Sequence, residues 1–569
     1  MFPSFDDASF DEPNDHVQSR EMVRNAASMQ NIRGHGSAES PAATLQSARE
    51  SNMTNHRNDI PDRSKTVSDE ANMNPRRFPQ ATRKNVEGYT GMFCDFLTKN
   101  PTVFHAVDDI KQKLLKRGYT KLSERDAWKI KPSGKYFVER NGSSLIAFIV
   151  GEKYEPGNGA AILAGHVDAL TAKLKPVSQV PNKAGYLQLG VAPYAGGMNS
   201  TWWDRDLGIG GRVLVQEGDK TVTKLVKLDW PIAKIPTLAP HFGAAASGPF
   251  NPETQMTPII GLEGTDASAT PYQTGEPFSQ PSYIGQGGGH DHKMRPFVST
   301  QPPGLVRAIG NALGLRENQL TSIVNWELEL FDVQPATVCG LNKEFITAGR
   351  IDDKLCSWAA IEALDFSDEF DTAYSSIIKV VGLFDDEEIG SGLRQGARSN
   401  FLPAVLERAV GSLNGGSMPS DLMGRTYANS FLVSSDVTHA VNPNFLGAYL
   451  ENHAPYLNTG LVVAADPNGH MTTDAVSTAI LQKCAERVGA KLQVFQIRND
   501  SRSGGTVGPM LSSMTGIRSI DAGIPQLSMH SIRATTGALD PGLGIMAFVG
   551  FLNGFELIDK EFRSYHGYD

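Results

Sequence analysis

Four consecutive carboxylic acids follow a strongly apolar stretch in the second half of the chain. The stretch Ile377–Phe384 is rich in β-branched and aromatic residues and runs directly into Asp385, Asp386, Glu387 and Glu388. Such a run is typical of a buried strand that presents the next residues at its carboxyl tip, where open α/β sheets bind their ligands. Because neighbouring carboxylates repel each other when partly desolvated, they either take up protons or hold a cation. The pattern therefore predicts a metal site.

Histidine and aspartate residues end other strand-like segments in the same way. His166 and Asp168 follow the apolar run Ala161–Gly165, and because they are two residues apart in an extended chain they face the same side. Asp168 could therefore orient the imidazole. Asp352 precedes an apparent helix, where its two oxygens could bridge two cations or cap the helix without any metal. Two further β-prone runs end in Asp436 and His530.

Five potential ligands thus follow strand-like runs in the chain order His, Asp, Glu, Asp, His. Each alone is more often a structural residue, but together they predict two divalent ions about 3.5–4 Å apart that share one aspartate. Imidazole and carboxylate ligands without thiolate favour zinc, with manganese or cobalt as alternatives. Glu387 would take a proton from the water between the ions and pass it to the leaving amine. The predicted ligands are His166, Asp352, Glu388, Asp436 and His530.

The composition argues against several classes of protein. The chain has 569 residues, of which 40% are hydrophobic and 20% charged, as expected of a globular protein with about three to four structural units. A net charge of -9 gives no support to nucleic acid or an anionic membrane as partner. We expect neither a membrane span of roughly 20 apolar residues nor a secretory signal. Four widely spaced cysteines without a CxxC pair favour reduced thiols over disulfides.

The texture of the chain changes twice, which predicts one domain interrupted by another. Residues 1–85 are polar and are expected to form a disordered or propeptide-like tail, in which Ser19–Arg33 could be a partner-binding amphipathic helix or simply solvated chain. Residues 86–172 and 346–569 alternate β and α signals, as in an α/β domain. Residues 173–345 are rich in Gly, Pro and β-like runs and are expected to form an inserted, mainly β domain.

Two shorter segments carry local predictions of their own. The apolar residues of Gly91–Arg117 have helical spacing and predict a helix. Gly287–His292 holds two histidines beside glycines. A flexible loop makes a poorly preorganised metal site, so we expect no catalytic role there.

The metal-ligand segments resemble those of the aspartyl aminopeptidase family of two-zinc metallopeptidases. The resemblance covers about residues 88–558 and rests on many separate blocks, so it is specific. Within the family it is strongest to the fungal vacuolar members, through His166–Ser178, Pro467–Asp474 and Asn499–Thr506. The blocks shared with the family as a whole are Gly165–Leu170, Trp203–Arg212, Arg350–Asp353, Asp386–Ser391, Ser435–Asp436 and Gln526–Arg533.

The resemblance implies a mixed-sheet zinc aminopeptidase domain with helices on both faces, interrupted by an inserted, mainly β dimerisation domain. It also implies two zinc ions per subunit, with Glu387 as general base and Asp168 as its supporting acid. The inserted domain would contribute His241 to the active site of the neighbouring subunit, within a homo-oligomer expected to be a dodecamer. The implied ligand sets are His166, Asp352 and Asp436 for one ion and Asp352, Glu388 and His530 for the other.

The expected substrate follows from one departure from the family pattern. Members that prefer acidic amino-terminal residues carry a lysine shortly before the block aligned with Pro467–Asp474, and Ala464 takes its place here. A substrate carboxylate would then lack its cation, and a buried unpaired charge is costly. We therefore expect release of neutral, Leu-like residues from peptides. The alternatives are an aspartyl aminopeptidase preferring Asp or Glu, a carboxypeptidase or deacylase, and a self-assembling vacuolar cargo scaffold with residual activity.

The resemblance also bears on where the protein acts. The fungal vacuolar members carry an amino-terminal propeptide whose helix drives self-aggregation and recognition by an autophagy-type cargo receptor, and Ser19–Arg33 could play that part. This implies delivery from the cytoplasm to the vacuole without a secretory signal. The cytoplasm is the alternative location.

Overall fold

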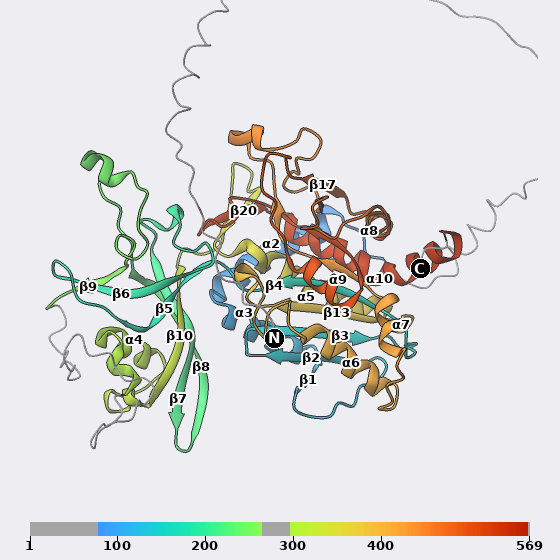
Figure 1. Cartoon of the computed structure of the whole chain (residues 1–569), viewed down its shortest axis with the longest axis horizontal. Helices are drawn as coiled ribbons and strands as arrows, with labels where there is room; N and C mark the ends of the chain where they lie inside the picture. The colour runs from blue at the N-terminus through green and yellow to red at the C-terminus, as the bar shows by residue number, and fades with distance from the viewer. Residues whose placement is uncertain (1–77, 265–295, 567–569) are drawn as a thin grey trace, which may run out of the picture. The chain divides into compact units, whose positions relative to one another are not determined.

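The computed structural model describes residues 78–264 and 296–566, which are coloured in Figure 1. Two segments singled out above, Ser19–Arg33 and Gly287–His292, lie outside the described residues. All four cysteines are free thiols, as expected from their spacing.

A nine-stranded mixed sheet organises most of the described chain. Its strand order is β1-β2-β3-β13-β4-β14-β18-β16-β17, so strands far apart in the sequence lie side by side (Figure 1). The central strands β13, β4, β14 and β18 run parallel, and antiparallel neighbours flank them. Parallel strands bring their carboxyl ends to one edge, where the residues that follow can meet. The strands are β1 (Thr120–Leu122), β2 (Lys135–Arg140), β3 (Ser144–Val150), β4 (Ala160–His166), β13 (Ile378–Phe384), β14 (Phe431–Ser434), β16 (Leu461–Ala465), β17 (Leu492–Gln496) and β18 (Arg518–Gly523).

Helices cover both faces of this sheet, which confirms the predicted mixed α/β fold. Strands β3, β4, β13 and β14 are buried at every residue, as expected for strands covered on both sides. Alternate side chains join two separate apolar clusters, so that Leu163 belongs to one and Ile162 to the other. The helices of the first cluster are α2 (Arg83–Lys99), α3 (Val103–Lys116), α5 (Ile351–Asp371), α8 (Ala475–Arg487) and α10 (Asp540–His566), and those of the second are α6 (Phe401–Leu413), α7 (Leu422–Ala428) and α9 (Val507–Thr515).

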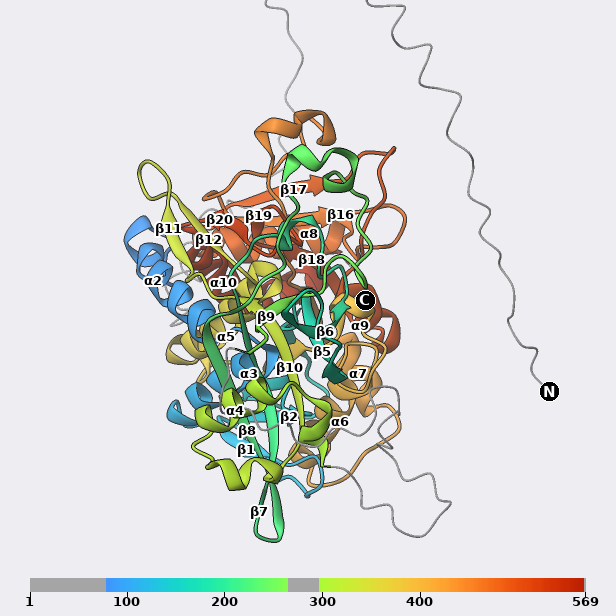
Figure 2. The ribbon, with the colours of Figure 1, turned by 90° about the vertical axis from the view of Figure 1, so that its left-hand side faces the viewer.

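A second, six-stranded sheet is antiparallel throughout and has an apolar core of its own. Its order is β8-β7-β10-β5-β6-β9, and Figure 2 turns it toward the viewer. Helix α4 (Pro303–Ala312) contributes Leu305 and Ile309 to that core. The domain limits 173–345 and a role in dimer formation stay predictions. The strands are β5 (Thr171–Gln179), β6 (Tyr186–Tyr194), β7 (Leu207–Glu217), β8 (Lys220–Ala233), β9 (Ile259–Leu262) and β10 (Ile323–Asp332).

A third, five-stranded sheet supplies two connections that matter for the site. Its order is β11-β12-β20-β19-β15. Strand β12 leads into α5, and the loop between β19 and β20 contains His530. The strands are β11 (Thr337–Cys339), β12 (Phe345–Ala348), β15 (Thr438–His439), β19 (Pro525–Leu527) and β20 (Ala534–Gly537).

The segment Gly91–Arg117, whose apolar residues have helical spacing, belongs to two helices. Helix α2 ends before Asn100, which leaves helical geometry at φ -117° and ψ 70°. The next residue, Pro101, offers no N–H, and its ring disfavours a helical conformation of the residue before it. Thr102 then caps α3 by accepting a hydrogen bond from the His105 N–H. The helical spacing of the segment is therefore confirmed, and Pro101 divides it into two helices.

Helix α10 is long and apolar enough, by length and composition, to cross a membrane. Its most apolar window is 89% buried inside the fold, where the helix contacts α5 and α8. Such burial is typical of a core helix, which is apolar on most sides. The packing of this helix in the core accounts for its apolar composition.

Candidate metal centre

The carboxyl edge of the parallel strands gathers three of the predicted ligands. His166 is the last residue of β4. Glu388 lies in η5 (Glu387–Ile389), the short turn that follows β13. Asp436 comes two residues after the end of β14. Neighbouring strands therefore deliver an imidazole and two carboxylates to the same edge.

The other two predicted ligands arrive from the five-stranded sheet. Asp352 lies in the first turn of α5, after β12, and the peptide bond between Asp352 and Asp353 is cis. His530 lies between β19 and β20 with a backbone φ of 63°. Left-handed backbone is uncommon outside glycine and concentrates at functional sites. The two loops bring both side chains to the edge of the nine-stranded sheet.

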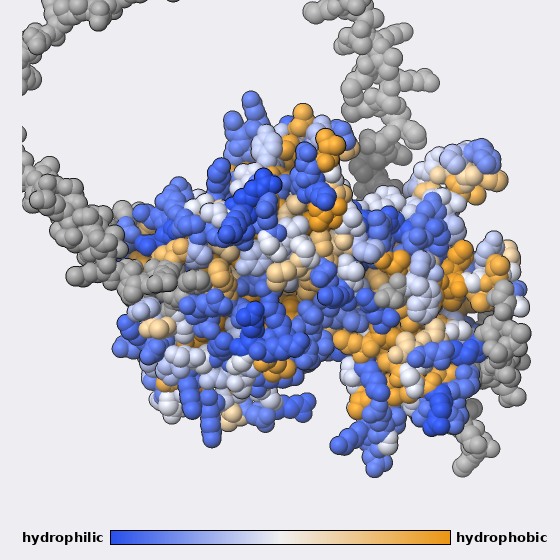
Figure 3. All heavy atoms as spheres, turned by 180° about the vertical axis from the view of Figure 1, so that it is seen from behind, coloured by the Kyte–Doolittle hydropathy of each residue, from blue (hydrophilic) through white to orange (hydrophobic). Residues whose placement is uncertain are grey.

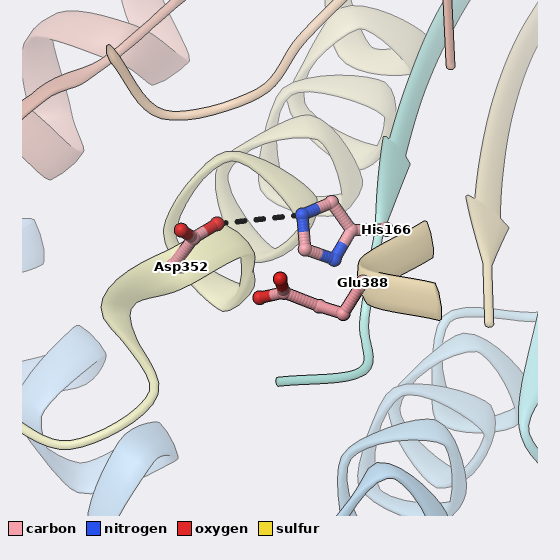
Figure 4. Close-up of side chains that lie close together, drawn as sticks. All are labelled: His166, Asp352 and Glu388. Atoms are coloured by element: carbon pink, nitrogen blue, oxygen red, sulfur yellow. Dashed lines mark ion pairs between the residues drawn. The ribbon is translucent and has the colours of Figure 1, made fainter. Parts of the chain in front are cut away.

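The five side chains form two overlapping groups. In the first, His166 Nε2 lies 3.3 Å from Asp352 Oδ1 and 3.4 Å from Asp436 Oδ1. In the second, His530 Nε2 lies 3.5 Å from Asp352 Oδ2 and 3.6 Å from Glu388 Oε2. The two oxygens of Asp352 therefore face two different imidazoles. Figure 4 shows His166, Asp352 and Glu388 converging from β4, α5 and η5.

These distances fit ligands gathered around metal ions. Two atoms bonded to one tetrahedral zinc ion at about 2.0–2.2 Å lie roughly 3.3–3.6 Å apart, which is the spacing of the pairs above. Among the described residues, Asp436 Oδ1 and Glu388 Oε1 are buried without a hydrogen-bond partner, and such atoms are costly unless something pairs with them. Imidazole and carboxylate without thiolate suit zinc. The residues present therefore fit a pair of zinc ions.

The centre holds more negative charge than its surroundings neutralise. Burial, and after it the nearby carboxylates, raises the pKa of Glu387 to about 8 and that of Glu388 to about 10. Burial alone would lower the pKa of His166, but Asp436 and the other acids raise it well above its usual value. The raised pKa of the two glutamates and that of His166 have a shared cause, which is an excess of buried negative charge. Bound cations would neutralise part of this charge.

Asp168 holds two parts of the centre in place. Its Oδ1 lies 3.3 Å from His166 Nδ1, and its carboxylate accepts the backbone N–H groups of Glu387 and Glu388, each at 3.2 Å. The hydroxyl of Tyr194, the last residue of β6, also donates to Asp168 at 2.8 Å. Asp168 thus anchors both the imidazole and the acidic turn. Tyr194 comes from the six-stranded sheet, and no local sequence signal pointed to it.

The predicted general base faces the same centre. Glu387 Oε2 lies 3.8 Å from His166 Nε2. The Glu387 side chain lines a cavity of about 320 Å³ that also contains the five predicted ligands. Glu387 is therefore free to exchange a proton with a group in that cavity.

The remaining walls of the cavity are mostly apolar. Arg502 is the one Lys or Arg among the described residues of the lining, and it is exposed. His439 of β15 also lines the cavity, with its ring 5.5 Å from that of Phe495, and burial lowers its pKa. A single histidine in a two-residue strand has no local sequence signal by which it could be recognised. The apolar lining consists of Val437, Ala464, Ala465, Met471, Phe495, Ile497, Ala522 and Met529.

His241 lies apart from the centre of its own chain. It belongs to η2 (Pro240–Ala246), is exposed, and stacks on Phe242 with ring centroids 4.9 Å apart. It is absent from the described lining of the cavity. A contribution of His241 to a neighbouring subunit stays a prediction.

The amino-acid sequence matches one protein family over most of its length. Residues 96–552 match the family described as Aminopeptidase I zinc metalloprotease (M18). Vacuolar aminopeptidase 1 of Saccharomyces cerevisiae is 43% identical over 485 residues, which cover 84% of this chain and 90% of the relative. Aspartyl aminopeptidase of Aspergillus oryzae is 37% identical over 484 residues, which cover 82% and 96%.

Solved structures share the same fold. The mApe1 of Chaetomium thermophilum is 54% identical with a TM-score of 0.74, over 84% of this chain and 99% of that one. The mApe1 dodecamer of S. cerevisiae is 37% identical with a TM-score of 0.71, over 84% and 99%. A complex of Ape4 and Nbr1 matches at 36% identity with a TM-score of 0.76, over 85% and 89%.

Proposed function

The chain belongs to the M18 family, the aminopeptidase I zinc metalloproteases, and we propose that this zinc aminopeptidase releases neutral, leucine-like residues from the amino end of peptides. The observation that carries the proposal is Ala464. It is 7% exposed and lines the cavity beside the predicted ligands, at the position where acid-preferring members of the family carry lysine. An apolar side chain of the substrate gains free energy on entering such a pocket.

An acidic substrate side chain would meet an unfavourable environment in the same cavity. The metal-ligand edge is crowded with carboxylates, which repel another one. Desolvating a carboxylate without a partner costs several kcal/mol. The exposed Arg502 is the one described lining group that could compensate, at the price of ordering a flexible side chain. The aspartyl aminopeptidases among the relatives make an Asp or Glu preference the alternative.

The distances between the side chains support the ligand sets that the resemblance implies. One zinc ion would be held by His166, Asp352 and Asp436, and the second by Asp352, Glu388 and His530. When bound, the pair supplies Lewis-acid polarisation of the scissile carbonyl and a water whose pKa is lowered toward about 7.

The chain itself supplies proton transfer and orientation. Glu387 accepts the proton of the attacking water and delivers it to the nitrogen of the leaving group. Asp168 fixes the orientation of the His166 imidazole and the position of the Glu387 backbone. The carboxylates at the edge of the nine-stranded sheet attract a positively charged amine, so they favour a substrate with a free amino group next to the scissile bond. An aminopeptidase requires such a group, whereas a carboxypeptidase or deacylase does not.

Hydrolysis of a small panel of p-nitroanilides tests this proposal. The Leu derivative should be cleaved with the higher kcat/KM, the Asp derivative at least about tenfold more slowly, and the N-acetyl-Leu derivative not at all. A chelator should abolish all cleavage, and zinc should restore it. Faster cleavage of the Asp derivative would overturn the neutral preference, and cleavage of the acetylated one would overturn the aminopeptidase assignment to this site.

We propose that the six-stranded sheet and its loops form a dimer interface within a dodecamer. Figure 3 shows apolar surface gathered on this part of the molecule, and large contiguous apolar surfaces mark protein contacts. In such a dimer His241 would enter the partner's active site. The exposed apolar side chains of the sheet and its loops are Val177, Tyr186, Trp230, Leu238, Phe242, Leu262 and Val324.

Coexpression of two inactive variants tests whether His241 acts on the neighbouring subunit. In a dimer of one H241A and one E387Q subunit, the H241A subunit keeps its own Glu387 and receives an intact His241 from its partner. Activity should therefore reappear on coexpression although each variant alone is nearly inactive. No recovery in purified mixed oligomers would show that His241 acts within its own chain or not at all.

A vacuolar location with delivery from the cytoplasm is proposed as well. It is supported by the likeness to a vacuolar aminopeptidase and by the Ape4 complex with Nbr1 among the similar structures. A receptor would recognise the tail, residues 1–85. Deleting residues 1–45 should leave peptidase activity intact and block delivery; unchanged delivery would remove the tail from the account. The scaffold alternative predicts no activity to lose in the E387Q variant.

A further inference from the structure

One buried carboxylate outside the predicted ligand set lies between the metal edge and the apolar wall of the cavity. Asp521 is on β18, is 2% exposed, and lines the cavity. Strand β18 pairs with β14 on one side, where Asp521 is opposite Ser434, and with β16 on the other, where Val463 is opposite Ala522. Two residues after Ser434 comes the predicted ligand Asp436, and directly after Val463 comes Ala464.

Hydrogen bonds join Asp521 to Thr472 and Thr473 in the loop that follows β16, and this set of bonds is called the clasp below. The N–H and the hydroxyl of Thr472 both donate to Asp521 Oδ2, the hydroxyl at 2.8 Å. The backbone N–H of Asp521 donates to the hydroxyl of Thr473 at 3.3 Å, and that hydroxyl donates to the carbonyl of Ala464 at 2.6 Å. Met471, next to Thr472, lines the cavity. These bonds fix the two ends of the apolar wall relative to β18.

The same carboxylate is enclosed from the opposite side by the first turn of α9. A Cβ on Gly508 would lie 2.4 Å from Asp521 Oδ1 and 2.9 Å from Oδ2, too close for any real contact. Thr506, two residues earlier, belongs to the lining of the cavity. The absence of a side chain at position 508 therefore leaves room for Asp521 in its observed position, between two segments that both form cavity walls.

We propose that Asp521 is a positioning residue that sets the shape of the substrate side-chain pocket through its clasp on Thr472 and Thr473. The inference rests on the proposed function, because it assumes that the wall containing Ala464 and Met471 receives the side chain of the released residue. Releasing the clasp lets this wall move without removing any predicted metal ligand. Binding of a large apolar side chain then weakens, while a side chain too short to reach the wall is little affected.

Replacing Thr472 tests the clasp with a closely matched pair of variants. Thr472→Val removes the hydroxyl and keeps the shape, and Thr472→Ser keeps the hydroxyl. Thr478→Val is the control, because the Thr478 hydroxyl donates to the Asp474 carbonyl and makes no bond to β18. Gly508→Ala is a second variant that displaces Asp521 from the other side and leaves the loop residues intact; its Cβ would also lie 2.9 Å from the Cβ of Ser434, so the zinc content must be shown to be unchanged before its KM is compared.

The readout is KM and kcat for the Leu and Ala p-nitroanilides, with zinc content measured in parallel. Thr472→Val and Gly508→Ala should raise KM for the Leu substrate about 3- to 10-fold and change the Ala substrate less than about twofold, with zinc content and the pH profile of kcat unchanged. Thr472→Ser and Thr478→Val should stay within about twofold of the parent. A 10-fold change corresponds to about 1.4 kcal/mol.

Three results would overturn the inference. They are an unchanged ratio of Leu to Ala cleavage in Thr472→Val, an equal loss in Thr472→Ser, and a fall in kcat for both substrates together. Failure of the proposed neutral preference is detected separately, since it appears in the parent enzyme as faster cleavage of the Asp derivative. If the parent enzyme does prefer the Asp derivative, Thr472→Val and Thr472→Ser are compared on the Glu and Asp derivatives. Thr472→Val should again raise KM for the longer side chain, and Thr472→Ser should not.

Discussion

Replacing Glu387 with glutamine should stop proton transfer without disturbing the fold. The two side chains have nearly the same shape, so the substitution keeps the packing and alters only the charge of the group that faces His166. Glu387 Oε2 lies 3.8 Å from His166 Nε2, within reach of a group held at the ligand edge. A general base contributes roughly 10²–10⁴ to the rate. We therefore expect kcat to fall at least about 10²-fold, or about 2.7 kcal/mol in the activation free energy.

The neighbouring Glu388 provides the matched control for this experiment. Initial rates on the Leu p-nitroanilide, zinc content and the thermal unfolding midpoint are measured for E387Q and E388Q side by side. E387Q should keep its zinc, its KM and its unfolding midpoint, whereas E388Q should lose zinc as well as activity. The reasoning is refuted if E387Q retains more than about a tenth of the parent kcat, or if its activity and zinc are lost together.

Three further changes should have separate effects. Ala464→Lys should place a cation in the cavity and raise the ratio of Asp to Leu cleavage at least about tenfold; an unchanged ratio would detach Ala464 from selectivity. Tyr194→Phe removes one donor to Asp168 and should lower kcat about 3- to 10-fold with zinc retained, so loss of zinc would contradict a purely orienting role. Burial, and after it Lys354 and Lys227, lowers the pKa of His105 to about 4. The unfolded chain then binds a proton at a higher pH than the folded one, so stability is lost as pH falls below about 6.5, by roughly 1–2 kcal/mol at pH 5. His105→Gln should show a smaller drop in unfolding midpoint from pH 7.5 to pH 5; an identical drop would exclude His105 as the cause.

The sequence predicts those parts of the site that local patterns encode. An apolar, β-branched run followed by His or Asp indicates both a buried strand and a ligand at its tip, and His166 and Asp436 lie where this pattern places them. Parallel strands share one edge, so several such runs predict one site. The sequence also predicts that one aspartate is shared by two metal ions. The two oxygens of Asp352 face His166 and His530, as a shared carboxylate requires.

Contacts that depend on distant chain segments were not predictable in this way. Tyr194 reaches Asp168 from the six-stranded sheet, and Asp521 acquires its role only because β18 lies between β14 and β16. Neither residue has a spacing or neighbour that marks it. The end of helix α2 is local by contrast, since Pro101 is visible in the sequence and its effect on Asn100 is a matter of backbone sterics.

Zinc content per subunit tests the central claim most directly. The parent protein and the variants Asp352→Asn and His530→Ala are dialysed against zinc at a fixed free concentration, and bound metal is counted by mass spectrometry. Since Asp352 faces both imidazoles, the account predicts about two zinc ions in the parent, about one in His530→Ala and close to none in Asp352→Asn. A parent with one ion, or an Asp352→Asn variant that keeps two, would contradict it.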